Sequence, residues 1–132
     1  MTATIPDKFL DLVRAPGVAV LTTLGPDGSP QTTALWYFLD DDGFVKLSLN
    51  VARRKTKNLT QRPACTLFFL DPRNPYRTLE IRAEAAVAPD EGKTFAARVG
   101  THYGTDFTAN DQPGEERVIV TLHPVKINTF GA

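Results

Sequence analysis

The positive charge of this chain is concentrated in one segment, and its residue types suit the binding of an anion. Residues Gly43 to Leu70 contain six basic residues and no Asp or Glu, although 15 basic and 15 acidic residues cancel over the whole chain. Four of the six lie in the run Arg53-Arg54-Lys55-Thr56-Lys57, which Asn58 follows directly. Cationic groups beside a hydroxyl, an amide and the free N–H groups of a helix start can together bind a phosphate. We therefore predict an anion site here, with an ordinary solvated surface helix as the alternative.

The distribution of charge disfavours nucleic acid as that anion. A groove that follows a nucleic-acid strand needs several separated basic stretches with aromatic residues among them. Here the basic block is single, and the rest of the chain is net acidic because the total formal charge is +0. One phosphorylated small molecule fits better than a polymer, so we expect no nucleic-acid partner.

Other catalytic machinery is sparse. The sequence contains no Walker A, GxGxxG or HExxH motif, and His102 and His123 have no Cys or acidic partners at metal-ligand spacing. The single cysteine, Cys65, lies in an apolar run, which favours a buried structural thiol. We predict no metal site and assign no catalytic residue. Chemistry carried by a bound cofactor suits a chain with so few reactive groups.

Strands are the main elements available to position the basic block. Apolar and β-branched runs predict strands over 18–24, 31–39, 44–50, 64–70, 76–87 and 117–130, the first three forming a meander. Helices are predicted over 6–14, 56–61 and 89–103. Six strands with marginal helices predict a mostly β fold, and a closed or split antiparallel barrel would cover most of the strand edges. The length fits one domain over residues 1–132.

The chain also carries signals about its compartment. No apolar run approaches the roughly 20 residues of a membrane-spanning helix. The first residues lack the basic and apolar regions of a secretory signal, and a lone cysteine excludes an intrachain disulfide. We therefore expect a cytoplasmic protein that does not associate with a membrane.

Four blocks, in their order along the chain, resemble the pyridoxamine 5′-phosphate oxidase-like split β-barrel family. They are the first hairpin from Val20 to Phe38, the stretch Ser48 to Leu59, the stretch Asn74 to Ala83, and the stretch Val118 to Lys126. The second block is similar to the actinobacterial branch that binds the deazaflavin coenzyme F420. The resemblance spans nearly the whole chain. It implies a six-stranded antiparallel split β-barrel that forms a homodimer, with two cofactor sites in grooves between the subunits.

The resemblance also implies which residues hold the cofactor. The phosphate-bearing tail would be bound by Arg53, Lys55, Thr56, Lys57 and Asn58, and the ring would be lined by Ser48, Leu49 and Asn50. Further contacts would come from Gln31, Thr33 and Trp36 on the second strand, and from Tyr76 and Arg77 of the partner chain. The implied reaction is hydride transfer between coenzyme F420 and a small conjugated or electrophilic acceptor. FMN is the alternative cofactor, and a non-catalytic flavin- or deazaflavin-binding protein is the alternative function.

Overall fold

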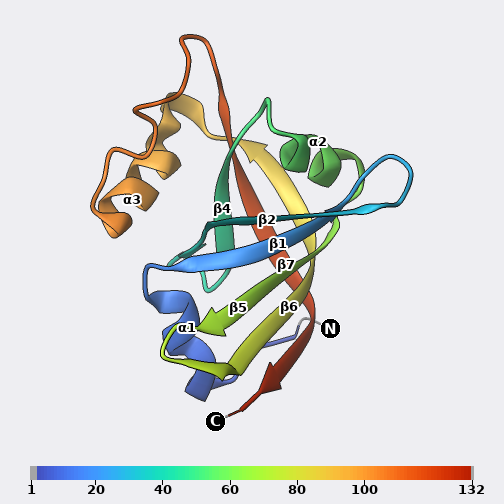
Figure 1. The fold of residues 1–132 in the computed structure, drawn as a ribbon. Helices are drawn as coiled ribbons and strands as arrows, with labels where there is room; N and C mark the ends of the chain where they lie inside the picture. The colour runs from blue at the N-terminus through green and yellow to red at the C-terminus, as the bar shows by residue number, and fades with distance from the viewer. Residues whose placement is uncertain (1–2, 132) are drawn as a thin grey trace.

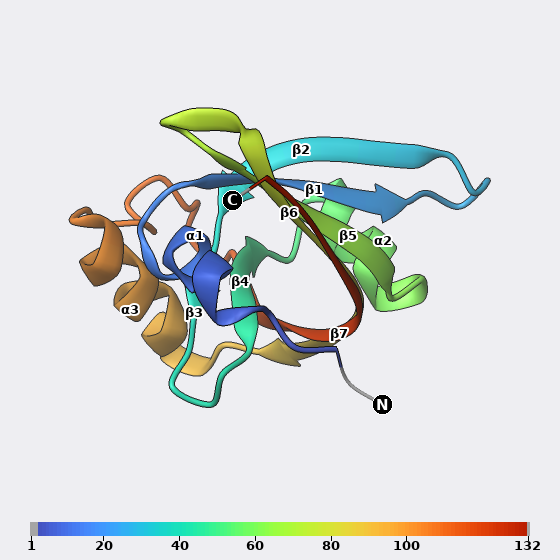
Figure 2. The same cartoon turned by 90° about the horizontal axis from the view of Figure 1, so that it is seen from below.

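A computed structural model describes residues 3–131, in which strands dominate (Figure 1). Antiparallel pairing joins seven strands into one sheet in the order β2-β1-β5-β6-β7-β4-β3. Their bounds are β1 Val18–Leu24, β2 Pro30–Trp36, β3 Phe38–Leu39, β4 Val45–Asn50, β5 Ala64–Asp71, β6 Asn74–Pro89 and β7 Arg117–Phe130. Seen from below, the sheet curls around its core (Figure 2). The fold is thus the mostly β, antiparallel split barrel that the sequence predicts.

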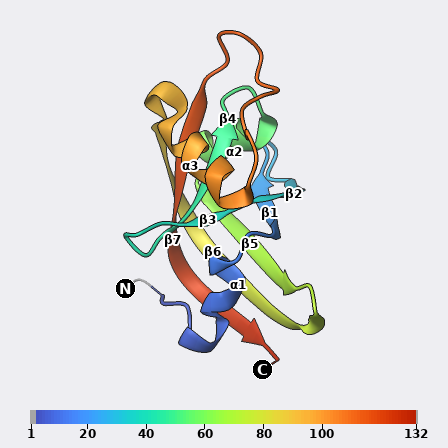
Figure 3. The same ribbon diagram turned by 90° about the vertical axis from the view of Figure 1, so that its left-hand side faces the viewer.

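Three short helices cover the ends and one flank of the curled sheet. They are α1 Leu10–Arg14, α2 Arg54–Gln61 and α3 Thr94–Tyr103, and the 3-10 turns η1 Asp7–Phe9 and η2 Glu91–Lys93 precede α1 and α3. Helix α1 lies at the same end as both termini, whereas α2 and α3 lie toward the other end (Figures 1 and 3). Alternate residues of the strands fill the interior, among them Leu21, Leu47, Leu67, Leu79 and Leu122. No helix within residues 3–131 is long and apolar enough to cross a membrane.

The predicted strand over 31–39 is interrupted at Tyr37, so the strand count is seven rather than six. Strand β2 pairs with β1 and β3 pairs with β4, but the other neighbour of β4 is β7. The predicted three-stranded meander is therefore present only as two separate hairpins, β1–β2 and β3–β4, at opposite edges of the sheet. The two hairpins separate at Tyr37, because its backbone forms hydrogen bonds with a side chain instead of a neighbouring strand. The Tyr37 N–H donates to the Tyr103 hydroxyl over 3.1 Å. The chain passes there from one edge of the sheet to the other.

The remaining elements agree with their predicted types and differ mainly at their ends. Helix α2 begins at Arg54 rather than Thr56, and β6 runs from Asn74 to Pro89. Helix α3 starts only at Thr94, where both oxygens of the Asp90 carboxylate accept backbone N–H bonds of 2.9 Å from Phe95 and Ala96. Cys65 is buried in β5, as predicted, and this burial raises the pKa of its thiol to about 12.

Candidate functional site

The basic block meets β4 and the end of β2 in a cleft of about 370 Å³. Six predicted site residues line it, namely Trp36, Ser48, Leu49, Asn50, Arg53 and Lys55. Three residues that the sequence did not indicate also line it: Leu35, Phe107 and Arg117. The structure thus brings together the start of α2, the end of β4 and an aromatic residue of β2, as a site for one small anionic molecule requires.

Two cations stand at the α2 side of this cleft. Arg53 immediately precedes the helix, which has no side-chain cap and no acidic residue in its first turn. Within residues 3–131, no carboxylate lies at ion-pair distance from Arg53 or Lys55. Burial, together with the charge of Arg53, lowers the pKa of the half-buried Lys55 ammonium. Like charges at the positive end of a helix dipole repel each other, and a bound anion would relieve that repulsion.

Strand β4 contributes a backbone edge to the cleft, on which the Asn50 carbonyl oxygen accepts bonds from the Thr56 hydroxyl and the Arg53 N–H. Strand β3 pairs only with Val45 and Lys46, so no strand of the described chain pairs with the rest of β4 on that side. The side-chain oxygen of Asn50 accepts the Ala52 N–H over 2.8 Å. Its amide nitrogen makes no hydrogen bond within residues 3–131. Unpaired peptide groups of an edge strand can bond the carbonyl and N–H groups along the edge of a flat heterocycle.

An aromatic wall completes the cleft. The Trp36 ring stacks on Tyr103, with centroids 4.2 Å apart and planes 9° apart, and on Phe107 at 5.3 Å and 28°. Phe107 lies in the loop from Gly104 to Glu116, which joins α3 to β7 (Figure 3). Its sequence signal is an aromatic residue within a polar segment, too common a pattern to mark a site.

Several predicted site residues lie outside the cleft lining and fasten α2 to the sheet. The buried Thr56 hydroxyl donates to the Asn50 carbonyl oxygen over 2.7 Å. The fully buried amide of Asn58 donates to the side-chain oxygens of Thr23 and Gln31, each over 3.1 Å. Thr33 lies 3.5 Å from the Lys55 ammonium. None of Gln31, Thr33, Thr56 and Asn58 lines the cleft.

The other cations of the basic segment divide into two groups. Arg54 and Lys57 are exposed on α2, outside the cleft lining. Lys46 and Arg62 are used within the fold instead. Lys46 pairs with Asp40 at 2.8 Å and with Asp42 at 2.7 Å, and Arg62 donates to the Leu24 carbonyl oxygen over 2.8 Å. The segment therefore delivers fewer cations to the cleft than its formal charge of about +6 suggests.

Tyr76 and Arg77 lie at the start of β6 and do not line the cleft of their own chain. Arg77 is buried, where it donates to Asp11, Asp71 and the Lys8 carbonyl oxygen over 2.6–3.1 Å. Tyr76, in contrast, is 76% exposed. The structure gives Arg77 a role within its own chain, and the approach of Tyr76 and Arg77 to a partner's cleft stays a prediction.

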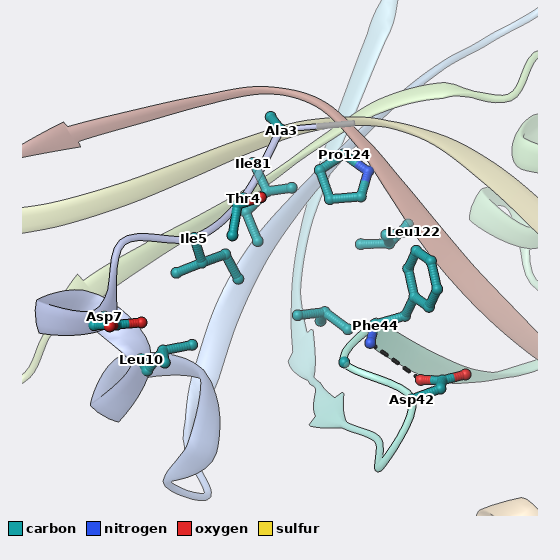
Figure 4. Close-up of a pocket in the computed structure, with 12 residues that line it drawn as sticks. Ala3, Thr4, Ile5, Asp7, Leu10, Asp42, Phe44, Ile81, Leu122 and Pro124 are labelled. Carbon is teal, nitrogen blue, oxygen red and sulfur yellow. Dashed lines mark hydrogen bonds between the residues drawn. The ribbon is translucent and has the colours of Figure 1, made fainter. Parts of the chain in front are cut away.

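A second cavity, of about 300 Å³, lies between α1, the β3–β4 turn and β7 (Figure 4). Ile5, Leu10, Phe44 and Leu122 line it together with the carboxylates of Asp7 and Asp42 (Figure 4). None of the described residues lining it is basic. An apolar cavity with acidic groups is unsuited to an anionic ligand, so this cavity is not the predicted anion site.

Comparisons with known proteins agree with this geometry. A family model described as pyridoxamine 5′-phosphate oxidase matches residues 5–131. The chain is 28% identical to a solved structure of an F420 reductase, over 94% of this chain and 98% of that chain, with a TM-score of 0.82.

Two more distant structures show likeness of fold alone. A conserved hypothetical protein from Mycobacterium tuberculosis is 23% identical over 98% of this chain and 86% of its own, with a TM-score of 0.77. A pyridoxamine 5′-phosphate oxidase-related, FMN-binding protein from Nostoc punctiforme is 13% identical over 85% of this chain and 72% of its own, with a TM-score of 0.64.

Proposed function

The chain belongs to the pyridoxamine 5′-phosphate oxidase family, and we propose that it is an oxidoreductase that binds coenzyme F420 in the cleft beside α2. Its substrate would be a small conjugated or otherwise electrophilic acceptor of a hydride. One observation carries the proposal. Arg53 and Lys55, which have no carboxylate partner among the described residues, share a single cleft with the stacked Trp36 and the edge of β4. That combination matches an anionic tail joined to a flat ring.

The choice between coenzyme F420 and FMN depends on how far the positive charge extends. The F420 tail carries further negative charge on its lactyl and glutamyl groups, and the exposed Arg54 and Lys57 continue the positive surface beyond the cleft. The 28% identity to an F420 reductase supports the same choice. FMN is the second candidate, because the two cations that line the cleft, Arg53 and Lys55, are enough to neutralise a single phosphate.

The residues of the chain would bind, orient and shield the cofactor. Arg53 and Lys55 would hold the phosphate, while Ser48, Asn50 and the edge of β4 would fix the ring edge. Trp36 and Phe107 would exclude water from one side. When bound, the deazaflavin ring supplies the hydride. No described lining residue carries a carboxyl group or an imidazole, and the Lys55 ammonium is assigned to the phosphate, so the proton that completes the reduction of a conjugated acceptor would come from solvent.

We also propose that the protein is a homodimer that associates through the outer face of the sheet. Val20, Phe68 and Glu80 share this face because Val20 pairs with Phe68 and Phe68 with Glu80 across the strands. Phe68 is 37% exposed and Leu70 is 48% exposed on the same side of β5. Large apolar side chains on a sheet face fit a second copy of the chain better than solvent.

The decisive experiment is a side-by-side titration of the purified protein with coenzyme F420 and with FMN, followed by fluorescence. We expect saturable binding of both, tighter for F420. Reduced F420 is then tested for turnover with conjugated acceptors, which separates an enzyme from a carrier. Failure of both ligands to bind would refute the cofactor site, whereas binding without turnover of any acceptor would favour the carrier.

A further inference from the structure

A third cation, Arg117 of β7, also lines the cleft. It is the first residue of β7 and pairs with Asn50 at the end of β4. Its guanidinium is held in a fixed plane: Nε and Nη2 each donate over 2.9 Å to one oxygen of Asp111. The guanidinium carbon also lies 4.4 Å from the centre of the Phe107 ring. A bidentate pair with an aromatic contact fixes a guanidinium far better than a single bond does.

Asp111 is itself held in place. Its side chain is only 8% exposed and accepts a bond of 3.0 Å from the Lys93 ammonium. Lys93 has a φ of 57°, the one positive φ of a non-glycine residue within 3–131. A positive φ is unfavourable for a residue that has a Cβ atom, and it persists only where the surrounding structure imposes it. Hydrogen bonds from Arg117, more than those from Lys93, hold the pKa of Asp111 well below its usual range.

These contacts leave one nitrogen of Arg117 weakly engaged. Nη1 lies 3.4 Å from both the carbonyl oxygen and the hydroxyl of Ser48, at the outer limit of hydrogen bonding. Ser48 lines the same cleft. Nη1 is thus a hydrogen-bond donor that is fixed in position beside the cleft. It can form a stronger hydrogen bond with an acceptor in the cleft than it forms with Ser48.

We propose that Arg117 binds the ring of the cofactor rather than its phosphate, with Nη1 donating to a ring carbonyl oxygen; this inference rests on the proposed function. Arg117 shares the Asp111 carboxylate with Lys93, and its two bonds to that carboxylate fix the direction of Nη1. Arg117 therefore offers a directed N–H and attracts a phosphate less than an unpaired cation does. Arg53 and Lys55 lack such a partner among the described residues and are the phosphate-binding cations. Asp111 and Lys93 act through Arg117 and are positioning residues. Flavin and deazaflavin rings both carry imide carbonyl groups, so the contact serves either cofactor.

Ligand pairs that differ only in their tail test the assignment. The probes are FMN against riboflavin, and coenzyme F420 against its chromophore without the phosphate-bearing tail, titrated by fluorescence. Arg117→Gln should weaken the binding of each member of a pair by the same factor, about tenfold or more. Lys55→Ala should weaken only the tailed members. Arg98→Gln is the matched control, because Arg98 also pairs with a carboxylate, Asp40, and lies over the ring of Phe38, but is outside the cleft.

A double-mutant cycle tests the role of Asp111. Asp111→Asn keeps the shape of the side chain and should weaken riboflavin binding in the wild-type background, but have no effect in the Arg117→Gln background. A merely structural role for Asp111 would give the same loss in both backgrounds. Thermal melting reports whether each variant is folded, and Arg117→Lys, which keeps the charge but lacks the planar fork, replaces Arg117→Gln if the latter does not fold.

The results separate the two proposals. If the wild-type protein binds none of the four ligands, the proposed function fails and this inference fails with it. If the tailed ligands bind but no tail-free ring does, the cofactor site stands and the ring contact is overturned. The inference is likewise overturned if a folded Arg117 variant binds riboflavin as the wild type does, or loses affinity only for FMN.

Discussion

The hydroxyl of Tyr103 contacts both backbone polar groups of Tyr37: it accepts the N–H over 3.1 Å and lies 2.8 Å from the carbonyl oxygen. The same hydroxyl lies 3.3 Å from the nitrogen and 2.8 Å from the oxygen of Gly17. One side chain at the end of α3 therefore replaces the strand pairing that is missing where the barrel is split. Its ring also supports Trp36 at the cleft.

Removing this hydroxyl should destabilise the fold. Tyr103→Phe leaves part-buried peptide groups of Gly17 and Tyr37 without partners, which costs about 1–3 kcal/mol. Urea unfolding measures the loss. Tyr76→Phe is the control, because Tyr76 is 76% exposed and its hydroxyl makes no hydrogen bond within residues 3–131. Equal stabilities of the two variants would show that water forms hydrogen bonds with these peptide groups as well as the Tyr103 hydroxyl does.

The two lysines of α2 should contribute differently to binding. Lys55→Ala should weaken FMN binding by roughly 1.5–3 kcal/mol, the loss of one charge-assisted phosphate contact. Lys57 is exposed and outside the cleft lining, so Lys57→Ala should leave FMN binding almost unchanged but weaken the binding of the longer F420 tail. Fluorescence titration of both variants with FMN and with coenzyme F420 gives the four dissociation constants. Equal losses of FMN affinity in the two variants would contradict the placement of the phosphate beside Lys55.

The pH dependence of binding should reflect the buried position of Lys55. Burial, followed by the charge of Arg53, lowers the pKa of Lys55 from its ordinary value near 10.5. The ammonium therefore loses its proton earlier as pH rises, and FMN affinity should fall over that range. Lys55→Arg stays protonated and should bind FMN with no such fall. An identical alkaline loss of affinity in both proteins would exclude Lys55 as its origin.

Lys55 should also make folding stability depend on pH, but in the opposite direction to FMN affinity. The unfolded chain binds the Lys55 proton more tightly than the folded, ligand-free protein does, so folding stability contributed by this group rises with pH through the window between the two pKa values. Thermal melting without ligand should show this rise in the wild-type protein relative to Lys55→Arg.

The outer face of the sheet should govern association. Phe68→Arg replaces a large exposed apolar side chain of this face with a charged one, so a dimer should become a monomer in light scattering. Ala109→Arg introduces the same charge at an exposed position of the loop from Gly104 to Glu116 and should leave the dimer intact. A wild-type protein that is already a monomer at micromolar concentration would remove the basis for the shared-groove arrangement.

The parts that were predictable from sequence depend on local signals. The charge run at α2 is local, so an anion site at Arg53 and Lys55 could be predicted from the residues themselves. Ser48 and Asn50, which share the cleft with them, were assigned to the site through the family resemblance. Asn58 shows the limit of such signals. A polar residue in a basic run suggests solvent or ligand contact, but its amide is fully buried against Thr23, which is 35 positions away in sequence.

Distant pairings account for the features that were missed. The break at Tyr37 depends on Tyr103, 66 positions away, and the ion pair of Arg77 depends on Asp11, also 66 positions away. Arg117 reaches the cleft because β7 pairs with β4, a neighbour that the expected meander did not include. Composition and periodicity describe each segment separately and cannot report which distant residue will meet it.

The loop from Gly104 to Glu116 has a consequence for how such proteins diverge. It supplies Phe107 to the cleft and rests against Arg117, yet it forms no part of the strand ladder. Insertions, deletions or exchanges there would reshape the cleft beside Phe107 while the barrel, Arg53 and Lys55 stay as they are. Under the proposed function, chains of this fold could in this way keep one coenzyme and differ in the acceptor that they reduce.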